Sequence, residues 1–278
     1  MSLASADALA FASRLKIERA KYHINDLNSK ISAFMEERPY RLVIQHKPKA
    51  REYVIASKRQ KTIPEEWSLI IGDAVHNLCA ALDLAIYGMA SDRATHPWEL
   101  MFPFVREPKD LERKIKSTQV HFAGTYVVRT ICELQPYPGG NEILSGLHRL
   151  DTRDKHRLLI LTGQVADFSA DLLRKLFPDT PHAPALRPEQ IARLLHSDTE
   201  ITPVFKGHGA DYSIFHAIGR SDDFEQEANV QPPYRIAFGE GQPFEFKPVI
   251  ETLRACTDAV EQVVADLIEA FLSPRNIR

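Results

Sequence analysis

"EEWSLIIGDAVHNLCAALDLAIYGMAS", residues 65–91, is the stretch that decides the fold. It follows Pro64 and begins with two glutamates, which stabilise the positive end of a helix dipole. The residues that follow are mostly apolar, with short polar side chains spaced three or four positions apart. This spacing predicts one long helix from Glu65 to about Ser91.

The same helical period recurs on both sides of this stretch. From Ser5 to Glu37, apolar residues return at steps of four and three, which indicates a long first helix. Asn141 is a suitable N-cap for a later helix. We expect helices over residues 5–37, 65–91, 111–117, 125–134, 142–161 and 248–272, which amounts to a bundle of about five main helices.

Strands interrupt this bundle in two places. "RLVIQHKPKAREYVIAS" has two β-branched runs around Pro48 and predicts a hairpin over residues 40–57. Between 163 and 247 the helical period fades, leaving a short helix at 187–195 and strands at 201–206, 211–218 and 234–240. The expected fold class is α+β: a mainly helical bundle with a hairpin in its N-terminal half and a small sheet inserted before the C-terminal helix.

This pattern favours a single domain over 1–278. Its parts are a helical bundle with the hairpin (1–162), a β-rich insertion (163–247) and a C-terminal helix (248–272) that returns to the bundle and could lie against the first helix. A content of 44% hydrophobic and 26% charged residues is typical of a globular protein with a buried core.

Composition also bounds the location of the protein. Three cysteines far apart fit neither a disulfide framework nor a CxxC metal site, and they favour a reducing cytoplasm. We expect no membrane-spanning segment and no leader peptide, since no uninterrupted apolar run approaches the roughly 20 residues that a span needs. Net charge is only −2, yet residues 40–61 carry seven Lys or Arg and one Glu. That basic stretch fits either lysines that guard an edge strand or a surface for a polyanion.

A polar stripe marks the helix at 65–91. Asp73, His76, Asn77 and Asp83 fall on one face when the chain is placed on a helical wheel. Such a stripe is either a solvated face or a half-buried hydrogen-bonding network. Because short Asp, His and Asn side chains suit fixed hydrogen bonds, we favour the half-buried network.

The helix expected at 142–161 separates its charges between two faces. Asp151 and Asp154 project into the apolar face, whereas Arg149, Arg153 and His156 gather on the opposite one. A carboxylate among leucines requires a partner. The candidate partners are His76, Arg129 and Arg19.

The three residues on the outward face, Arg149, Arg153 and His156, suit phosphate chemistry. Arg149 and His156 are two helical turns apart, so the arginine could hold a phosphate while the imidazole transfers a proton. An exposed basic face without function is the alternative.

Asp73 and His76 alone are weak support for a metal, and the chain has no GxGxxG, P-loop or GxSxG motif, so we expect no metal and no cofactor.

Three ordered motifs resemble a family of bacterial proteins without an established activity. That family has GDxxHNLRxALDHL, LQPY and LxxLxxxDKHR blocks, which here read "GDAVHNLCAALDLA", "LQPY" and "LHRLDTRDKHRLL". Cys79 stands where the family has Arg, and Leu84 where it has His. An activity that needs those two side chains is therefore in doubt for this chain.

A more distant resemblance is to the HEPN helical ribonucleases, which place an Arg and a His on one helix and build their RNA-cutting site across a dimer. Arg149 and His156 fit that spacing, although Leu150 stands where a polar residue is typical. The resemblance implies an RNA or nucleotide ligand and a homodimer.

Two functions follow as hypotheses, and the sequence leaves open whether the chain is an enzyme. One is a metal-independent, HEPN-like ribonuclease or nucleotide-acting defence protein, with His156 as acid/base and with Arg149 and Arg153 on the phosphate. The other is a non-catalytic binding or assembly module, whose Asp, His and Arg cluster only specifies packing.

Overall fold

The computed structural model describes residues 3–47, 52–155, 159, 161–165, 205–206, 224–227 and 234–276. These residues belong to two compact units. The helical unit comprises Met1–Ser29, Glu65–Ile160 and Phe238–Arg278, and the sheet unit comprises Lys30–Pro64 and Leu161–Ala237. The fold is α+β and mainly helical, as the sequence predicts. Folding of the whole chain as one cooperative domain stays a prediction.

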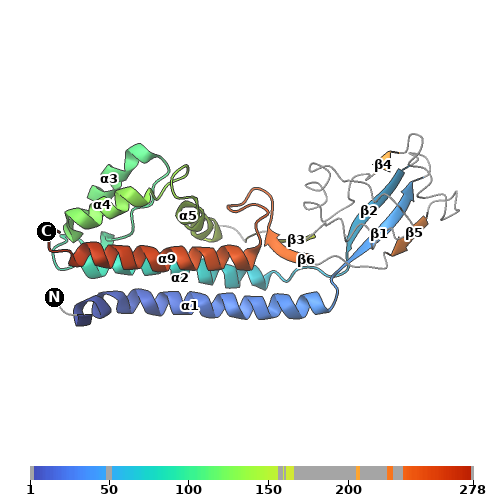
Figure 1. The fold of residues 1–278 in the computed structure, drawn as a ribbon, viewed down its shortest axis with the longest axis horizontal. Coiled ribbons are helices and arrows are strands. Elements are labelled where there is room, and N and C mark those ends of the chain that lie inside the picture. Colours follow the sequence, from blue (N-terminus) through green and yellow to red (C-terminus); the bar gives the residue numbers. More distant parts are fainter. Residues whose placement is uncertain are drawn as a thin grey trace. The chain divides into compact units, whose positions relative to one another are not determined.

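Three long helices form the frame of the helical unit: α1 (Leu3–Glu36, of which the part to Ser29 belongs here), α2 (Glu66–Ala90) and α9 (Val249–Leu272). Shorter helices α3 (Leu111–Ser117), α4 (Thr125–Leu134) and α5 (Glu142–Asp154) lie on the side of α2 and α9 away from α1 (Figure 1). Three 3₁₀ turns, η1 (Pro97–Glu99), η2 (Pro108–Asp110) and η3 (Val120–Ala123), connect them.

Helix α2 is the core of this unit because it is apolar on most of its surface. Ile71, Leu78, Leu82 and Ile86 are completely buried. The helix packs against α9, α5 and η3. A buried Ser13 hydroxyl donates to the Ala81 carbonyl at 2.8 Å and joins α1 to α2.

The first and last helices also meet, as the sequence suggested. Lys21 Nζ on α1 lies 2.7 Å from Glu261 Oε1 on α9. The chain therefore closes the bundle with a helix that follows it in sequence by more than 200 residues.

The sheet unit contains a four-stranded sheet in the order β4-β2-β1-β5. Strands β1 (Tyr40–Lys47) and β2 (Glu52–Arg59) form the predicted antiparallel hairpin, with Tyr40 opposite Arg59. Two strands of the insertion extend this hairpin: β4 (Phe205–Lys206) pairs antiparallel with β2, and β5 (Phe224–Glu227) pairs antiparallel with β1. The hairpin strands are thus the inner strands of the sheet where β4 and β5 pair with them, but β4 pairs only with Glu52 and Tyr53 of β2. A lysine-guarded edge along the rest of β2 therefore stays a prediction.

A second, two-stranded sheet pairs β3 (Leu161–Val165) with β6 (Tyr234–Phe238). Strand β6 was predicted, whereas β3 and β5 were not. Tyr40 and Tyr234 stack with ring centroids 5.0 Å apart, which links β6 to the start of the hairpin.

One predicted helix boundary is wrong. Helix α5 ends at Asp154 rather than near Leu161, which instead opens β3. The apolar run after Arg157 fits a buried strand as well as a helix, because it lacks the polar positions that distinguish the two. Pro48 in the hairpin connection, the helix at 187–195 and the strand at 211–218 fall outside the described residues.

Helix α2 also has the length and composition of a membrane span. An 18-residue window within it has a mean hydropathy of 1.6, and 56% of that window is buried in the protein. This corrects the expectation that no segment is long and apolar enough. It is weak evidence for a membrane, because the core helix of a soluble protein passes the same test.

Candidate functional site

Helix α5 positions the candidate site, and its start is fixed by a cap. The Asn141 side chain accepts a hydrogen bond from the Leu144 amide at 3.0 Å, as the sequence predicts. One turn later, Gly146 lies against the Phe244 ring of the 239–247 loop. A Cβ at Gly146 would come within 2.7 Å of Phe244 Cε1. The glycine therefore allows this loop to pack directly on α5.

The inward face of α5 contains a buried carboxylate with two partners. Asp151 is only 5% exposed, and its two oxygens lie 3.2 Å from His76 Nδ1 and 2.6 Å from Lys155 Nζ. The predicted pairing of Asp151 with His76 is confirmed. Lys155 was missed, although a lysine four residues after an aspartate on a helix is a recognised pairing.

The other two predicted partners lie elsewhere. Arg129 pairs with Glu133 on the exposed side of α4, at 2.7 Å. Arg19 stacks over the Tyr22 ring of its own helix, 4.9 Å from the ring centroid. Both arginines find a partner within their own helices, which a helical wheel of α5 alone does not reveal.

Asp154 is half-buried rather than buried, and it lies against the backbone of α2. A Cβ at Gly72 would lie 2.6 Å from Asp154 Oδ1, so a larger residue at this position would require the Asp154 carboxylate to shift. Burial raises the pKa of Asp154, and the nearby carboxylates of Asp151 and Asp73 raise it further. The described residues provide Asp154 with no ion pair comparable to that of Asp151.

The polar stripe on α2 divides into three environments. Asp73 and His76 are exposed, and the half-buried Asn77 side chain donates to the Asp73 carbonyl at 2.7 Å. Asp83 is half-buried and accepts a hydrogen bond from the Phe102 amide at 2.8 Å. Burial is the main cause that raises the pKa of Asp83, and the Phe102 bond opposes it. Of the half-buried network expected from the sequence, the structure thus shows the bonds of Asp83 to Phe102 and of His76 to Asp151, whereas the Asn77 bond is an exposed contact within the helix.

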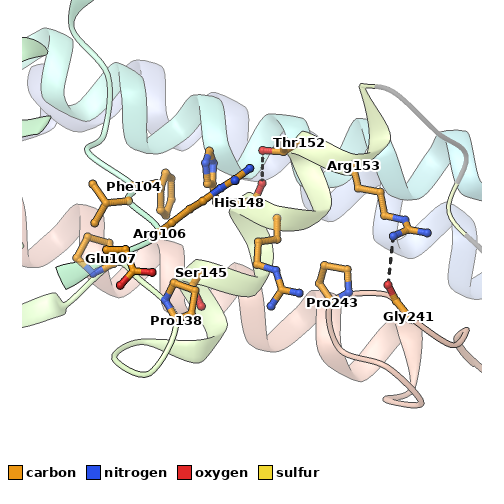
Figure 2. A pocket seen from close by; sticks show the side chains of 13 residues that line it. Phe104, Arg106, Glu107, Pro138, Ser145, His148, Thr152, Arg153, Gly241 and Pro243 are labelled. Atoms are coloured by element: carbon orange, nitrogen blue, oxygen red, sulfur yellow. Dashed lines mark hydrogen bonds between the residues drawn. The ribbon is translucent and has the colours of Figure 1, made fainter. Parts of the chain in front are cut away.

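The outward face of α5 forms one wall of an open groove of about 980 Å³. Residues 104–107 of the chain crossing between α2 and α3 form another wall, and the turn at Pro136 and Pro138 and the 239–247 loop complete it (Figure 2). All of these residues belong to the helical unit. The groove is a concave feature in which several charged groups converge, as is common for ligand sites.

Three arginines line this groove. Arg149 and Arg153 project from α5 as predicted, and Arg106 joins them from the crossing. Arg153 Nη1 donates to the Gly241 carbonyl at 3.2 Å (Figure 2). Its Nε atom is buried and has no hydrogen-bond acceptor among the described residues. A buried N–H that lacks an acceptor is costly.

A histidine that the sequence analysis did not select also lines the groove. The His148 ring stacks on Phe104 with centroids 4.4 Å apart and an interplanar angle of 6°. Arg106 runs alongside it (Figure 2). Burial lowers the pKa of His148, and the cations Lys155, Lys114 and Arg106 lower it further against the opposing effect of Asp151. The imidazole is therefore neutral at pH 7.

His156, the predicted acid/base, lies outside the described residues, so its placement relative to Arg149 stays a prediction. Within the residues that are described, no three His, Cys, Asp or Glu side chains are arranged to hold a metal ion. The groove thus offers cationic and imidazole groups.

Comparison of the chain with protein-family models, with curated protein sequences and with solved structures gave no match in any of the three.

Proposed function

We propose that the helical unit binds the phosphate of RNA or of a nucleotide in the α5 groove. The observation that carries this proposal is the convergence of three arginines, Arg106, Arg149 and Arg153, on one open groove, where a hydrogen bond to the Gly241 carbonyl holds the Arg153 guanidinium. A guanidinium presents its N–H groups in a planar fork that matches two phosphate oxygens. The three arginines that line the groove are therefore suited to such an anion.

The charge of the groove supports the same ligand. Arg106, Arg149 and Arg153 face one carboxylate, Glu107, which leaves a net charge of +2 (three minus one). Phosphate contacts of this kind position a nucleic acid without reading its sequence. An open groove admits both a nucleotide and a strand.

Cleavage of the bound RNA is the catalytic form of the proposal. A metal-independent ribonuclease requires a general acid/base beside the scissile phosphate, most often an imidazole, and His156 is the candidate from the sequence. His148 is the imidazole that lines the groove in the described residues. We keep both histidines as candidates for acid/base catalysis, together with a homodimer as the form in which the site operates.

A second candidate function is a non-catalytic binding or assembly module. The buried Asp151, held by His76 and Lys155, supports it, because such a network specifies how α5 packs on α2 irrespective of any ligand. The two functions are separable by experiment, since the network lies on the inward face of α5 and the arginines lie on the outward face.

Binding is tested by fluorescence anisotropy of a labelled ten-nucleotide RNA and by calorimetric titration with ATP. Arg149→Ala and Arg153→Ala should each weaken binding by about tenfold or more and reduce the salt dependence by about one phosphate contact. Arg129→Ala is the matched control, because Arg129 is an exposed arginine outside the groove. Affinity that is equal in the wild type and in both groove variants would overturn the proposal.

Cleavage is tested on the same RNA in the presence of EDTA. His156→Ala and His148→Ala should each retain the circular dichroism spectrum of the wild type, and the variant that lacks the acid/base should lose cleavage. Binding without cleavage by the wild type would remove the catalytic form and leave a binding module.

A further inference from the structure

The composition of the groove distinguishes between kinds of phosphate. Its net charge of +2 from Arg106, Arg149, Arg153 and Glu107 matches the charge of a terminal phosphate, which approaches −2 at neutral pH. An internal phosphodiester carries a single charge. A single internal phosphate of an RNA strand would therefore neutralise only part of the positive charge of the groove.

His148 supplies the second observation. Its ring is fixed by the stack on Phe104, and its nitrogens have no hydrogen-bond partner within the described part of the chain. Asp151 and Lys155 approach it from α5 and its end, Lys114 from α3 and Arg106 from the crossing. Burial is the main cause that lowers the pKa of His148, and the three cations add to it against Asp151, so a further negative charge beside the ring is needed to favour its protonated form.

We propose that the groove binds a phosphomonoester, the terminal phosphate of a nucleotide or of an RNA end, and that His148 is the contact that exchanges a proton with it. This inference rests on the proposed function and specifies its ligand. Binding involves no bond change other than one proton transfer. Above the pH at which the free imidazole titrates, the complex takes one proton from solution, and the protonated ring then donates to the phosphate dianion.

The pH dependence of affinity follows from this proton. A dianion beside His148 favours its charged form, so the pKa of the ring rises on binding. Between pH 7 and pH 8 the ligand is already mostly dianionic, and affinity should therefore fall by up to about tenfold per pH unit. A ligand held by arginines alone would show no such fall, because arginine does not titrate in this range.

The test compares a 5′-phosphorylated ten-nucleotide RNA with the same RNA ending in a 5′-hydroxyl, and AMP with adenosine, at pH 6.5, 7.0, 7.5 and 8.0. The phosphorylated probes should bind at least about tenfold more tightly at pH 7. His148→Phe keeps an aromatic ring on Phe104 but cannot be protonated, and His148→Gln serves if the phenylalanine variant does not fold. Both should bind AMP without the fall in affinity between pH 7 and pH 8.

His23→Phe is the matched control, because His23 on α1 is a half-buried histidine outside the groove whose pKa burial also lowers. It should retain the pH dependence of the wild type. Equal affinity for the phosphorylated and hydroxyl RNA, both weakened by Arg149→Ala, would overturn this inference and leave the proposed function standing. If Arg149→Ala leaves the affinity for both RNAs unchanged, this inference and the proposed function are both overturned.

Discussion

Replacing Lys155 with Met removes the ammonium that donates to Asp151 and keeps most of the aliphatic stem. Asp151 is buried, with a side chain only 6% exposed, so it cannot exchange this partner for water. After the change, only His76 at 3.2 Å remains beside the carboxylate. Folded protein should therefore lose stability, although Lys155 itself is largely solvated.

The expected loss in the free energy of unfolding depends on the charged hydrogen bond between Lys155 and Asp151 and on how exposed Lys155 is. A hydrogen bond to a charged group contributes about 1.5–3 kcal/mol to the free energy of unfolding. The Lys155 side chain is 55% exposed, which places the value towards the lower part of that range, at about 2 kcal/mol. For a chain of this size, that loss corresponds to a fall in Tm of roughly 4–8 °C.

The assay is urea unfolding of the full chain at pH 7, followed by circular dichroism, with a thermal scan as a second measurement. Lys109→Met is the control, because Lys109 is an exposed lysine outside the network. The double variant Asp151→Leu, Lys155→Met should regain about 1 kcal/mol or more, since it removes the uncompensated charge together with its partner. Hydrogen bonding to Asp151 raises the pKa of Lys155 above 10.5, so the contribution persists at neutral pH and disappears as pH rises through that higher pKa.

A loss from Lys155→Met no greater than that from Lys109→Met, within about 0.5 kcal/mol, would refute this reasoning. Asp151 would then be stable in the interior without the ammonium.

Three further predictions concern other contacts of the helical unit. Gly72→Ala should cost about 1–3 kcal/mol by overlap with Asp154, whereas Gly88→Ala on the same helix should be neutral or stabilising in urea unfolding, because its Cβ would meet Leu9 at an ordinary 3.6 Å. Asp154→Asn should stabilise the protein at pH 7 and lose this advantage towards pH 4, since a raised pKa means that the ionised carboxylate opposes folding; an unchanged difference across this range contradicts it. Asn276→Ala should cost about 2–3 kcal/mol in the same assay, because buried Asn276 bonds the Tyr126 amide and the Ala123 carbonyl, both at 2.9 Å; a loss below about 0.5 kcal/mol contradicts it.

The helices were predictable because their determinants are local. The bounds of α3 and α4 agree with the prediction, and α2, α9 and the Asn141 cap follow from apolar period, proline positions and capping chemistry. The inward position of Asp151 also follows from helical geometry alone. These properties depend on residues within a few turns of one another.

The sheet was only partly predictable, because its pairing is not local. Strand β5 joins β1 across roughly 180 residues, and "FEQE" has neither the alternation nor the β-branched content of a strand. Its partner, not its own composition, makes it a strand.

The candidate site was predictable on α5 and not beyond it. Arg149 and Arg153 were selected from one helical face, and the groove confirms their outward position. Arg106 comes from an irregular crossing without periodicity, and its approach to α5 depends on how the crossing packs. His148 was quoted within the same motif, but its role depends on the stack with Phe104, which no spacing in the sequence reveals.

The order of synthesis gives the placement of α9 a further consequence. Helix α2 leaves the ribosome long before α9, and at typical translation rates the interval is on the order of ten seconds. During that time, a segment apolar enough to pass as a membrane span lacks the helix that covers much of its surface. The nascent chain should therefore depend on chaperones that shield α2 until the final helix emerges.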